Sequence, residues 1–235
     1  MRLAALPVLL ALLLALAACG GDDEVTPTTE PDTTTDTTGT TPAFEEPDPL
    51  PRTEVEDGYL YEIEEDGFEI AVPRRWIARS SAQVPDPRTL RRLSVDYPVV
   101  IGYFETLVGD TPTRFVAATP NLRRNFASNL TVTMEDVEPG TTLEQYTQQT
   151  YAQILSTAAN LEGDIERARA QVPAGPARVI RYERRFSNDI VLETQHYLLV
   201  EGERGFALTY TTAVPDPSFQ QIVERSLHSF ALTED

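Results

Sequence analysis

The chain has a single cysteine, Cys19, which cannot form a disulfide within the chain. It follows a positively charged start, Met1-Arg2, an apolar run over residues 3–15, and the three residues Leu16-Ala17-Ala18. The apolar run is short for a bilayer span but suits the core of a signal peptide. A lone cysteine in an exported protein needs an explanation, and its position directly after a predicted cleavage site supplies one.

The sequence Leu16-Ala17-Ala18-Cys19 resembles the lipobox of bacterial lipoproteins. The resemblance implies that the Cys19 thiol receives diacylglycerol and that signal peptidase II cuts between Ala18 and Cys19. Each buried lipid methylene contributes about 0.8 kcal/mol, so two or three acyl chains anchor a protein stably. We therefore expect a signal peptide over residues 1–18 and a chain held by lipid on the outer face of a membrane. The alternative is an ordinary secretory signal with an incidental cysteine.

Other residue patterns give only weak evidence for a metal site, a catalytic site or a nucleotide-binding site. His196 and His228 lie far apart in the sequence, without a second ligand at metal-binding spacing, so we expect no metal site and no cofactor. The sequence contains neither a Gly-x-Ser-x-Gly nucleophile motif nor a glycine-rich nucleotide-binding motif. With 37 acidic residues, a pair of carboxylates for hydrolysis stays open, although no pair stands out.

Arginine supplies all 19 basic side chains, because the chain has no lysine. Arg88, Arg91 and Arg92 share one face of a predicted short helix, where they could bind an anionic partner such as a cell-wall phosphate polymer or a lipid headgroup. A second set lies along one predicted strand and its end: Arg178, Arg181, Arg184 and Arg185. The simpler interpretation of both sets is a surface on which arginines pair with the many acids.

The formal net charge of −18 is concentrated near the N-terminus, since residues 20–50 hold nine acids and no base. This segment is rich in Thr and Pro and poor in large apolar side chains, a composition typical of disorder. We therefore assign residues 19–56 to the lipidated cysteine and a linker, with a reach of about 30 Å. The acidic balance argues against broad nucleic-acid binding.

The globular domain that must position these side chains is expected over residues 57–235. Alternating apolar residues predict strands over 59–63 and 68–72, joined at the turn Asp66-Gly67, and Trp76 is a candidate core anchor. Asp86-Pro87 predicts the start of a helix with Leu90, Leu93 and Tyr97 on its buried side. Further strands are predicted over 99–107, 114–118 and 129–134.

A long helix is predicted over 142–158, with Leu143, Tyr146 and Ile154 on its buried face and Leu155 widening that face. Four strand patterns follow over 165–172, 177–186, 191–200 and 206–212, and a final amphipathic helix begins after Pro215-Asp216-Pro217. This order predicts an α+β fold, in which an antiparallel sheet has helices packed on its faces as an α/β/α sandwich.

Several of these segments together resemble the PsbP-like superfamily, over roughly residues 59–232. The resemblance lies in Phe-Glu-Ile-Ala-Val-Pro-Arg-Arg-Trp at 68–76, in the 129–134 strand before a long helix, in Gly-Pro-Ala-Arg at 175–178, in Gly-Phe-Ala-Leu-Thr-Tyr at 205–210 and in Ser229-Phe230. The superfamily includes PsbP proteins of photosystems, Ran-binding Mog proteins and actinobacterial lipoproteins of the LpqN type. These motifs are structural, so the resemblance implies the fold and transfers no binding residue.

Anchor, linker and domain together predict a non-enzymatic binding or assembly module in the cell envelope, with an envelope protein or a cell-wall component as partner. Two alternatives stay open. A carboxylate-based hydrolase would need two acids within several ångströms of each other and a perturbed pKa. A carrier of a small apolar ligand would need a cavity lined by Tyr and Leu between a helix and the sheet. The oligomeric state is left open.

Overall fold

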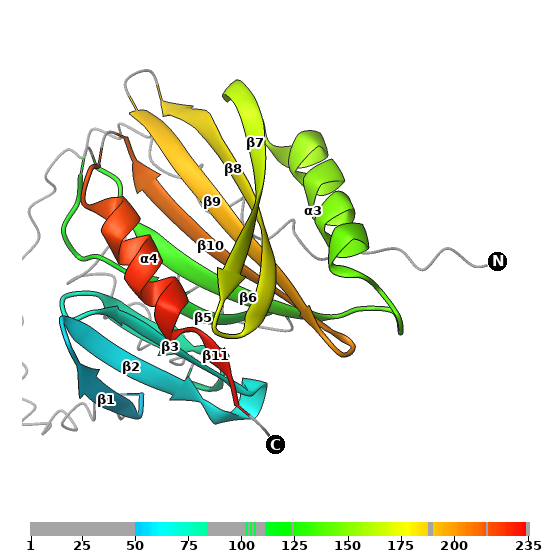
Figure 1. Cartoon of the computed structure of the whole chain (residues 1–235). Coiled ribbons are helices and arrows are strands. Elements are labelled where there is room, and N and C mark those ends of the chain that lie inside the picture. The colour runs from blue at the N-terminus through cyan, green and yellow to red at the C-terminus, as the bar shows by residue number, and fades with distance from the viewer. Residues whose placement is uncertain are drawn as a thin grey trace, which may run out of the picture.

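Two antiparallel sheets share one hydrophobic core in the computed structural model of the chain (Figure 1). The structure describes residues 50–83 and 111–233, without positions 124, 188–189 and 215, and in addition Gly102, Phe104 and Thr106. Over these residues the chain forms eleven strands and two α-helices whose bounds are described, and Gly102 and Phe104 are helical as well. The lipobox residues and the predicted linker up to residue 49 lie outside the described residues.

The smaller sheet has the strand order β1-β2-β3-β11. The predicted hairpin is confirmed as β2 (Gly58–Ile63) and β3 (Phe68–Pro73), which pair with Ile63 opposite Phe68. Strand β1 (Arg52–Val55) pairs with β2 although its residues were assigned to the linker, so the folded part begins before the predicted boundary at residue 57. Strand β11 (Ala231–Leu232) brings the C-terminal end of the chain to the far edge of β3.

The larger sheet has the order β4-β5-β6-β10-β9-β8-β7. Its last four strands confirm the predicted meander, in which neighbours in sequence pair in space. The short strand β4 was not predicted. The bounds are β4 (Ile77–Ser80), β5 (Thr113–Ala118), β6 (Asn129–Asp136), β7 (Leu161–Val172), β8 (Gly175–Ser187), β9 (Ile190–Glu201) and β10 (Arg204–Ala213).

The two helices lie on opposite faces of the larger sheet. Helix α3 (Leu143–Thr157) packs on Ile180 and Leu198, whereas α4 (Phe219–Ser229) belongs to the cluster that contains Val179 and Tyr197. Successive residues of a strand point to opposite faces, so these sets define two sides. A capping box at Thr142 begins α3. Leu155 is 52% exposed, so the prediction that it widens the buried face was wrong.

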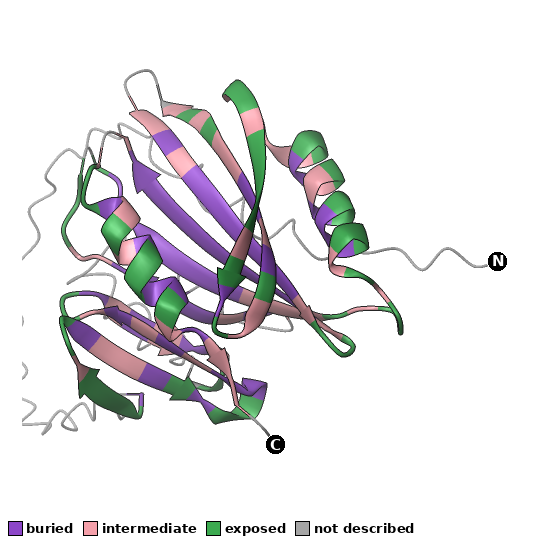
Figure 2. Cartoon of the chain, in the orientation of Figure 1, coloured by how far each residue is buried: buried purple, intermediate pink, exposed green. Residues whose placement is uncertain are grey.

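The main core lies between the larger sheet, the smaller sheet and α4, and includes Phe68, Ile70, Phe206 and Phe230 (Figure 2). Trp76 is buried there, as expected. The α+β class is confirmed, but the α/β/α sandwich was wrong for this face, because a second sheet covers it together with α4. Pairing between β3 and the C-terminal β11 completes that sheet, a non-local contact that periodicity does not reveal.

One predicted strand was wrong. Gly102 and Phe104, which lie in the expected strand over 99–107, are helical. A short apolar run is compatible with a buried strand or a buried helix, because it is too short to show a periodicity, and this is the physical reason for the error. The helix expected after Asp86-Pro87, with Arg88, Arg91 and Arg92, lies outside the described residues.

Candidate binding groove

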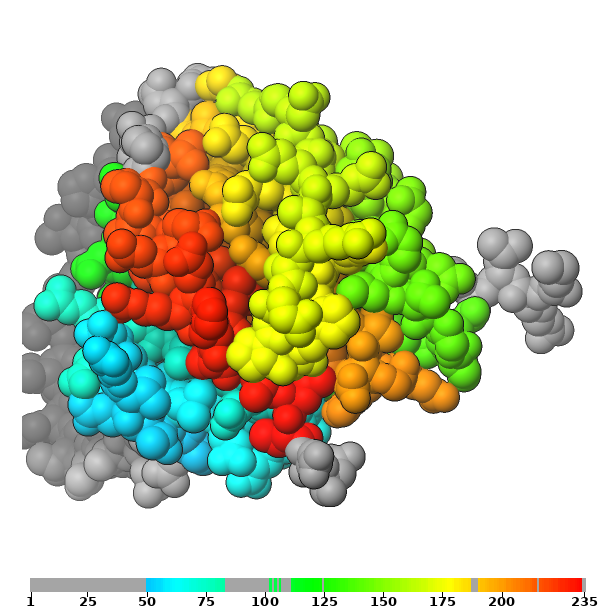
Figure 3. Space-filling model, in the orientation of Figure 1, coloured from blue at the N-terminus to red at the C-terminus, as the bar shows by residue number. Residues whose placement is uncertain are grey.

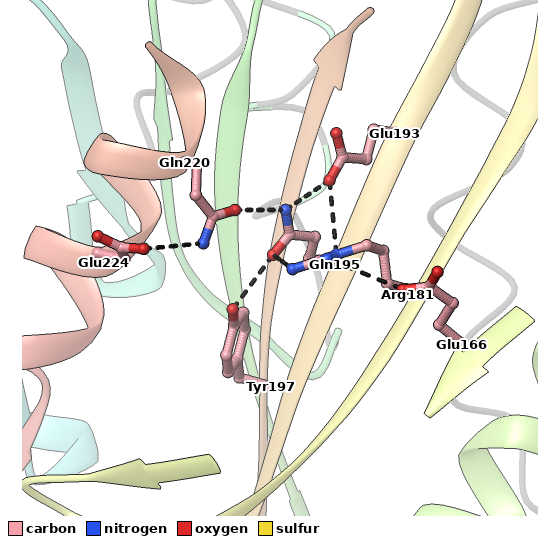
Figure 4. A network of polar contacts seen from close by, with 7 residues as sticks. All are labelled: Glu166, Arg181, Glu193, Gln195, Tyr197, Gln220 and Glu224. Carbon is pink, nitrogen blue, oxygen red and sulfur yellow. Dashed lines mark hydrogen bonds and ion pairs between the residues drawn. The ribbon is translucent and has the colours of Figure 1, made fainter. Parts of the chain in front are cut away.

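Helix α4 is attached to the larger sheet by a polar network centred on Gln195 (Figure 4). The Gln195 side chain is 1% exposed. Its Nε2 donates to Glu193 Oε1 at 2.6 Å and to Gln220 Oε1 of α4 at 3.1 Å. Its Oε1 accepts from Tyr197 Oη at 3.1 Å and from Arg181 Nη2 at 3.2 Å. All four bonds satisfy a buried amide, so the network fixes the N-terminal half of α4 on β9.

One cation lies between two of the acids in this network. Arg181 lies 3.6 Å from Glu193 and 3.8 Å from Glu166, so one guanidinium is shared between two carboxylates. Burial raises the pKa of Tyr197, with Arg181 opposing the shift, and the hydroxyl therefore stays a donor at neutral pH. The acids are paired with a cation rather than with each other, which is unlike the carboxylate pair of a glycoside hydrolase.

The C-terminal end of α4 is attached to the smaller sheet. The Ala71 backbone N–H, at the edge of β3, donates to Ser229 Oγ at 2.7 Å, and Ser229 Oγ donates to the Ser226 carbonyl at 2.6 Å. The chain then turns at Phe230 into β11, which pairs with β3. Helix α4 is thus held at both ends by different sheets, and it forms a fixed wall.

A groove of about 640 Å³ runs between this wall and the smaller sheet. We call it the α4 groove, and its lining includes Val55, Asp57, Leu60, Ala71, Arg225 and His228. Leu60 and Ala71 form apolar floor, because they lie on the face of β2 and β3 opposite to the buried Tyr61 and Ile70. Arg225 Nη1 bonds Asp57 Oδ2 at 2.9 Å, and this pair joins α4 to the β1–β2 turn.

Two separate hollows border the α4 groove and share lining residues with it. One of about 410 Å³ shares Asp57 and leads to Trp76, and one of about 430 Å³ shares Pro173 and Ala231 and leads to Arg204. In the space-filling view, α4 (red) lies directly beside the strands of the smaller sheet (blue) (Figure 3). An open hollow with an apolar floor fits an exposed segment of a partner better than a small enclosed ligand.

A buried histidine, His196, lies outside the groove. Burial lowers its pKa to about 4, and Arg184 adds to the effect. Its Nδ1 lies 2.9 Å from Thr209 Oγ1 and its Nε2 lies 3.3 Å from Tyr182 Oη, against which the ring stacks. Both ring nitrogens have partners, so His196 is a neutral, satisfied core residue.

The hydrolase hypothesis gains no catalytic pair from the described residues. Burial raises the pKa of Asp66, which faces Arg114 at 3.4 Å, and burial also raises the pKa of Glu135, which interacts with Tyr146. These two carboxyl groups have separate partners. In the part of the chain that the structure describes, no three His, Cys, Asp or Glu side chains are placed to hold a metal ion.

The carrier hypothesis placed tyrosines around a cavity between a helix and the sheet. Tyr146 of α3 is buried in the cluster between this helix and the sheet, and Tyr151 and Tyr182 pack against the same cluster. These side chains therefore fill the space between helix and sheet as core.

Over the described residues, no helix is long and apolar enough to cross a bilayer.

The predicted arginine set on β8 is largely ion-paired. Arg178 Nη2 lies 2.6 Å from Glu144 Oε2, and Arg185 pairs with Glu162. The residues that build the groove, above all Gln195, Gln220 and Ser229, were missed. A signal was present for one of them, because residues 193–197 form a polar run within the predicted strand over 191–200.

No protein-family model and no curated protein matches the chain. Among solved structures, the chain is similar to cyanobacterial PsbP (CyanoP) from Synechocystis sp. PCC 6803, at 13% identity over 76% of this chain and 94% of that one, with a TM-score of 0.51. It also matches LpqN of Mycobacterium tuberculosis, a protein involved in cell envelope biogenesis, at 9% identity over 71% of this chain and 83% of that one, with a TM-score of 0.45. At such identities the first match reports the fold alone, and the conclusion is that this chain has a PsbP-like fold.

Proposed function

We propose that the chain is a membrane-anchored lipoprotein of the cell envelope whose domain is a non-enzymatic docking module. Its ligand would be a segment of another envelope protein, bound in the α4 groove. The observation that carries the proposal is the α4 groove itself, which is open, apolar on its floor and lined by charged side chains on both sides.

The charges of the α4 groove are arranged to favour an amphipathic polypeptide. Glu56, Asp57 and Glu69 lie on the side of the smaller sheet, whereas Arg225 and His228 lie on α4. A partner segment with an apolar face can cover Leu60 and place its charged side chains toward these rims.

The ion pair across the α4 groove is suited to exchange. The side chains of Arg225 and Asp57 are 64% and 63% exposed. An exposed pair contributes roughly 0–1 kcal/mol, so a partner carboxylate can replace Asp57 at Arg225 with little loss of stability. Binding would then need no change in the fold.

Lipid on Cys19 and the acidic linker would confine the domain near the membrane. Confinement raises the effective concentration of a docking domain toward membrane partners without any new contact. The support for this part is the lipobox resemblance and the linker composition. Mass spectrometry of the mature N-terminal peptide tests it directly, because cleavage before Cys19 and the mass of an attached diacylglycerol are both visible.

A site-specific photocrosslink tests the groove. A photoreactive residue is introduced at Leu60 in the full-length protein, expressed in the native host and activated in whole cells. Leu155, an exposed leucine on α3, provides the matched control position. We expect Leu60, and not Leu155, to crosslink one envelope protein, and we expect Arg225→Glu and Cys19→Ala to reduce the yield.

Three results would count against docking in the α4 groove. Equal crosslinking from Leu155 would mean that the contact is not specific to the groove. Unchanged crosslinking in the Arg225→Glu variant would mean that the charge of Arg225 does not contribute to binding of the partner. A small molecule that co-purifies with the domain, with no protein crosslinked, would favour the carrier function.

A further inference from the structure

Strand β7 presents a long open edge on the side of the larger sheet away from β4. Within the described residues it pairs with β8 alone and ends the strand order of its sheet. Figure 2 shows it as mostly exposed, and residues 166–169 are all exposed. The pairing with β8 shifts register between Glu162 and Glu166, so the regular part of the edge is residues 166–172. Such an exposed edge is a template for pairing with another strand.

The register identifies the backbone groups that face outward. Val172 and Gly175 flank a two-residue turn, Pro173-Ala174, and form the first pair of the β7–β8 hairpin. Such a flanking pair is hydrogen-bonded, and bonded and non-bonded pairs then alternate. Gln171 is accordingly in a non-bonded pair, which agrees with its partner Pro176, a residue without an N–H.

The same alternation places Arg169 and Arg167 in non-bonded pairs with β8, opposite Arg178 and Ile180. Their backbone N–H and C=O groups therefore point to the free edge. Their side chains share the α3 face of the sheet, because Ile180 lies on that face. Ala168, between the two arginines, and Ala170, directly after Arg169, lie on the opposite face.

β7 as a whole carries three acids and two arginines, but its stretch at Arg167 and Arg169 is locally basic. Arg169 lies directly across from Arg178, and a like-charge cross-strand pair is destabilising. Of these arginines, Arg178 pairs with Glu144, with its Nη2 2.6 Å from Glu144 Oε2. Arg167 stacks on Tyr151, with its Cζ 4.6 Å from the ring centroid. An anionic partner over Arg167 and Arg169 would relieve the repulsion.

We propose that β7 is a second binding site, which adds an extended acidic segment of another protein as a further strand. In an added antiparallel strand, the residues bonded to Arg167 and Arg169 place their side chains on the same face as the arginines. The segment would therefore have acids at every second position. The residues between them lie beside Ala168 and Ala170, where small neighbours leave room for apolar side chains. This site is separate from the α4 groove and does not depend on it.

The probe is a synthetic ten-residue peptide that alternates Glu and Val, compared with a peptide of the same composition in which all Glu residues precede all Val residues. Binding to the full chain carrying Cys19→Ala is followed by fluorescence anisotropy. We expect the alternating peptide to bind at least about tenfold more tightly, because it alone matches both the arginine spacing and the alanine positions.

Two substitutions at one residue separate charge from backbone pairing. Arg169→Ala removes the guanidinium, whereas Arg169→Pro also removes the outward N–H and leaves the bonds to β8 in place. We expect Arg169→Ala to weaken the alternating peptide several-fold and Arg169→Pro to weaken it further. Circular dichroism checks that both variants fold, and Leu60→Asp in the α4 groove serves as the control that leaves binding unchanged.

Equal binding of the two peptides would overturn the proposal. Equal affinities of Arg169→Ala and Arg169→Pro would overturn it as well, since charge alone would then explain the binding. If the wild-type chain self-associates through β7 and excludes the peptide, a second copy of this chain is the occupant and the proposed partner is wrong.

Discussion

Replacing Gln195 with leucine tests whether the polar network holds α4. Leucine has a similar volume, but it removes the four hydrogen bonds of the amide. Arg181 and Glu193, with side chains 39% and 26% exposed, can regain water. Tyr197 and Gln220 lose a buried partner, at about 1–3 kcal/mol each. After a gain of about 1 kcal/mol from the apolar side chain, we expect a net loss of about 3 kcal/mol.

Urea unfolding measures the free energy directly, and thermal unfolding should show a drop in Tm of roughly 6–12 °C for a domain of this size. Gln149→Leu, on the exposed side of α3, is the matched control and should change the free energy of unfolding by less than about 0.5 kcal/mol. If Gln195→Leu costs no more than this control, the network does not attach α4, and the reasoning about a fixed groove wall fails.

Two further predictions concern the core. The pKa of His196 is lowered to about 4 by burial and then by Arg184, so its contribution to stability is fully present above pH 6.5 and is lost as the pH falls through 4. The loss amounts to about 3 kcal/mol, and His196→Gln should abolish it in urea titrations across that range; an unchanged pH dependence would contradict the assignment. A Cβ at Gly205 would lie 2.9 Å from Tyr146 Cζ, so Gly205→Ala should lower stability by about 1–3 kcal/mol in thermal unfolding. A variant as stable as the wild type would show that the Tyr146 ring moves freely.

Most of the local structure could be predicted because it follows from periodicity and turn residues. The meander from β7 to β10, helix α3 and helix α4 each have a repeat of two or 3.6 residues over a long segment. The short strands β1 and β11 were not predicted, because they hold too few residues to show a periodicity. The helical Gly102 and Phe104 were misread for the same reason, as a short apolar run has no diagnostic repeat.

The candidate site depended on contacts that no local pattern contains. Gln195 and Gln220 are separated by a strand, a turn and part of a helix, and each alone is an ordinary polar residue. Ser229 meets Ala71 across 158 positions of sequence. The arginines of β8 were visible, but whether they pair with Glu144 or face an open anion site required their positions in space.

By itself, the sequence determined the class of structure and the expectation of an anchored protein. Hydrophobic period, composition and the residues before Cys19 are local properties, readable without coordinates. Tertiary structure alone decided that a second sheet covers one face, that α4 and this sheet enclose a groove, and that Arg167 and Arg169 lie at an open edge. The physical reason is that a groove forms where segments distant in sequence pack beside each other, and an edge stays open where no further strand pairs with it. Such contacts are fixed by packing in the complete fold and not by any local segment.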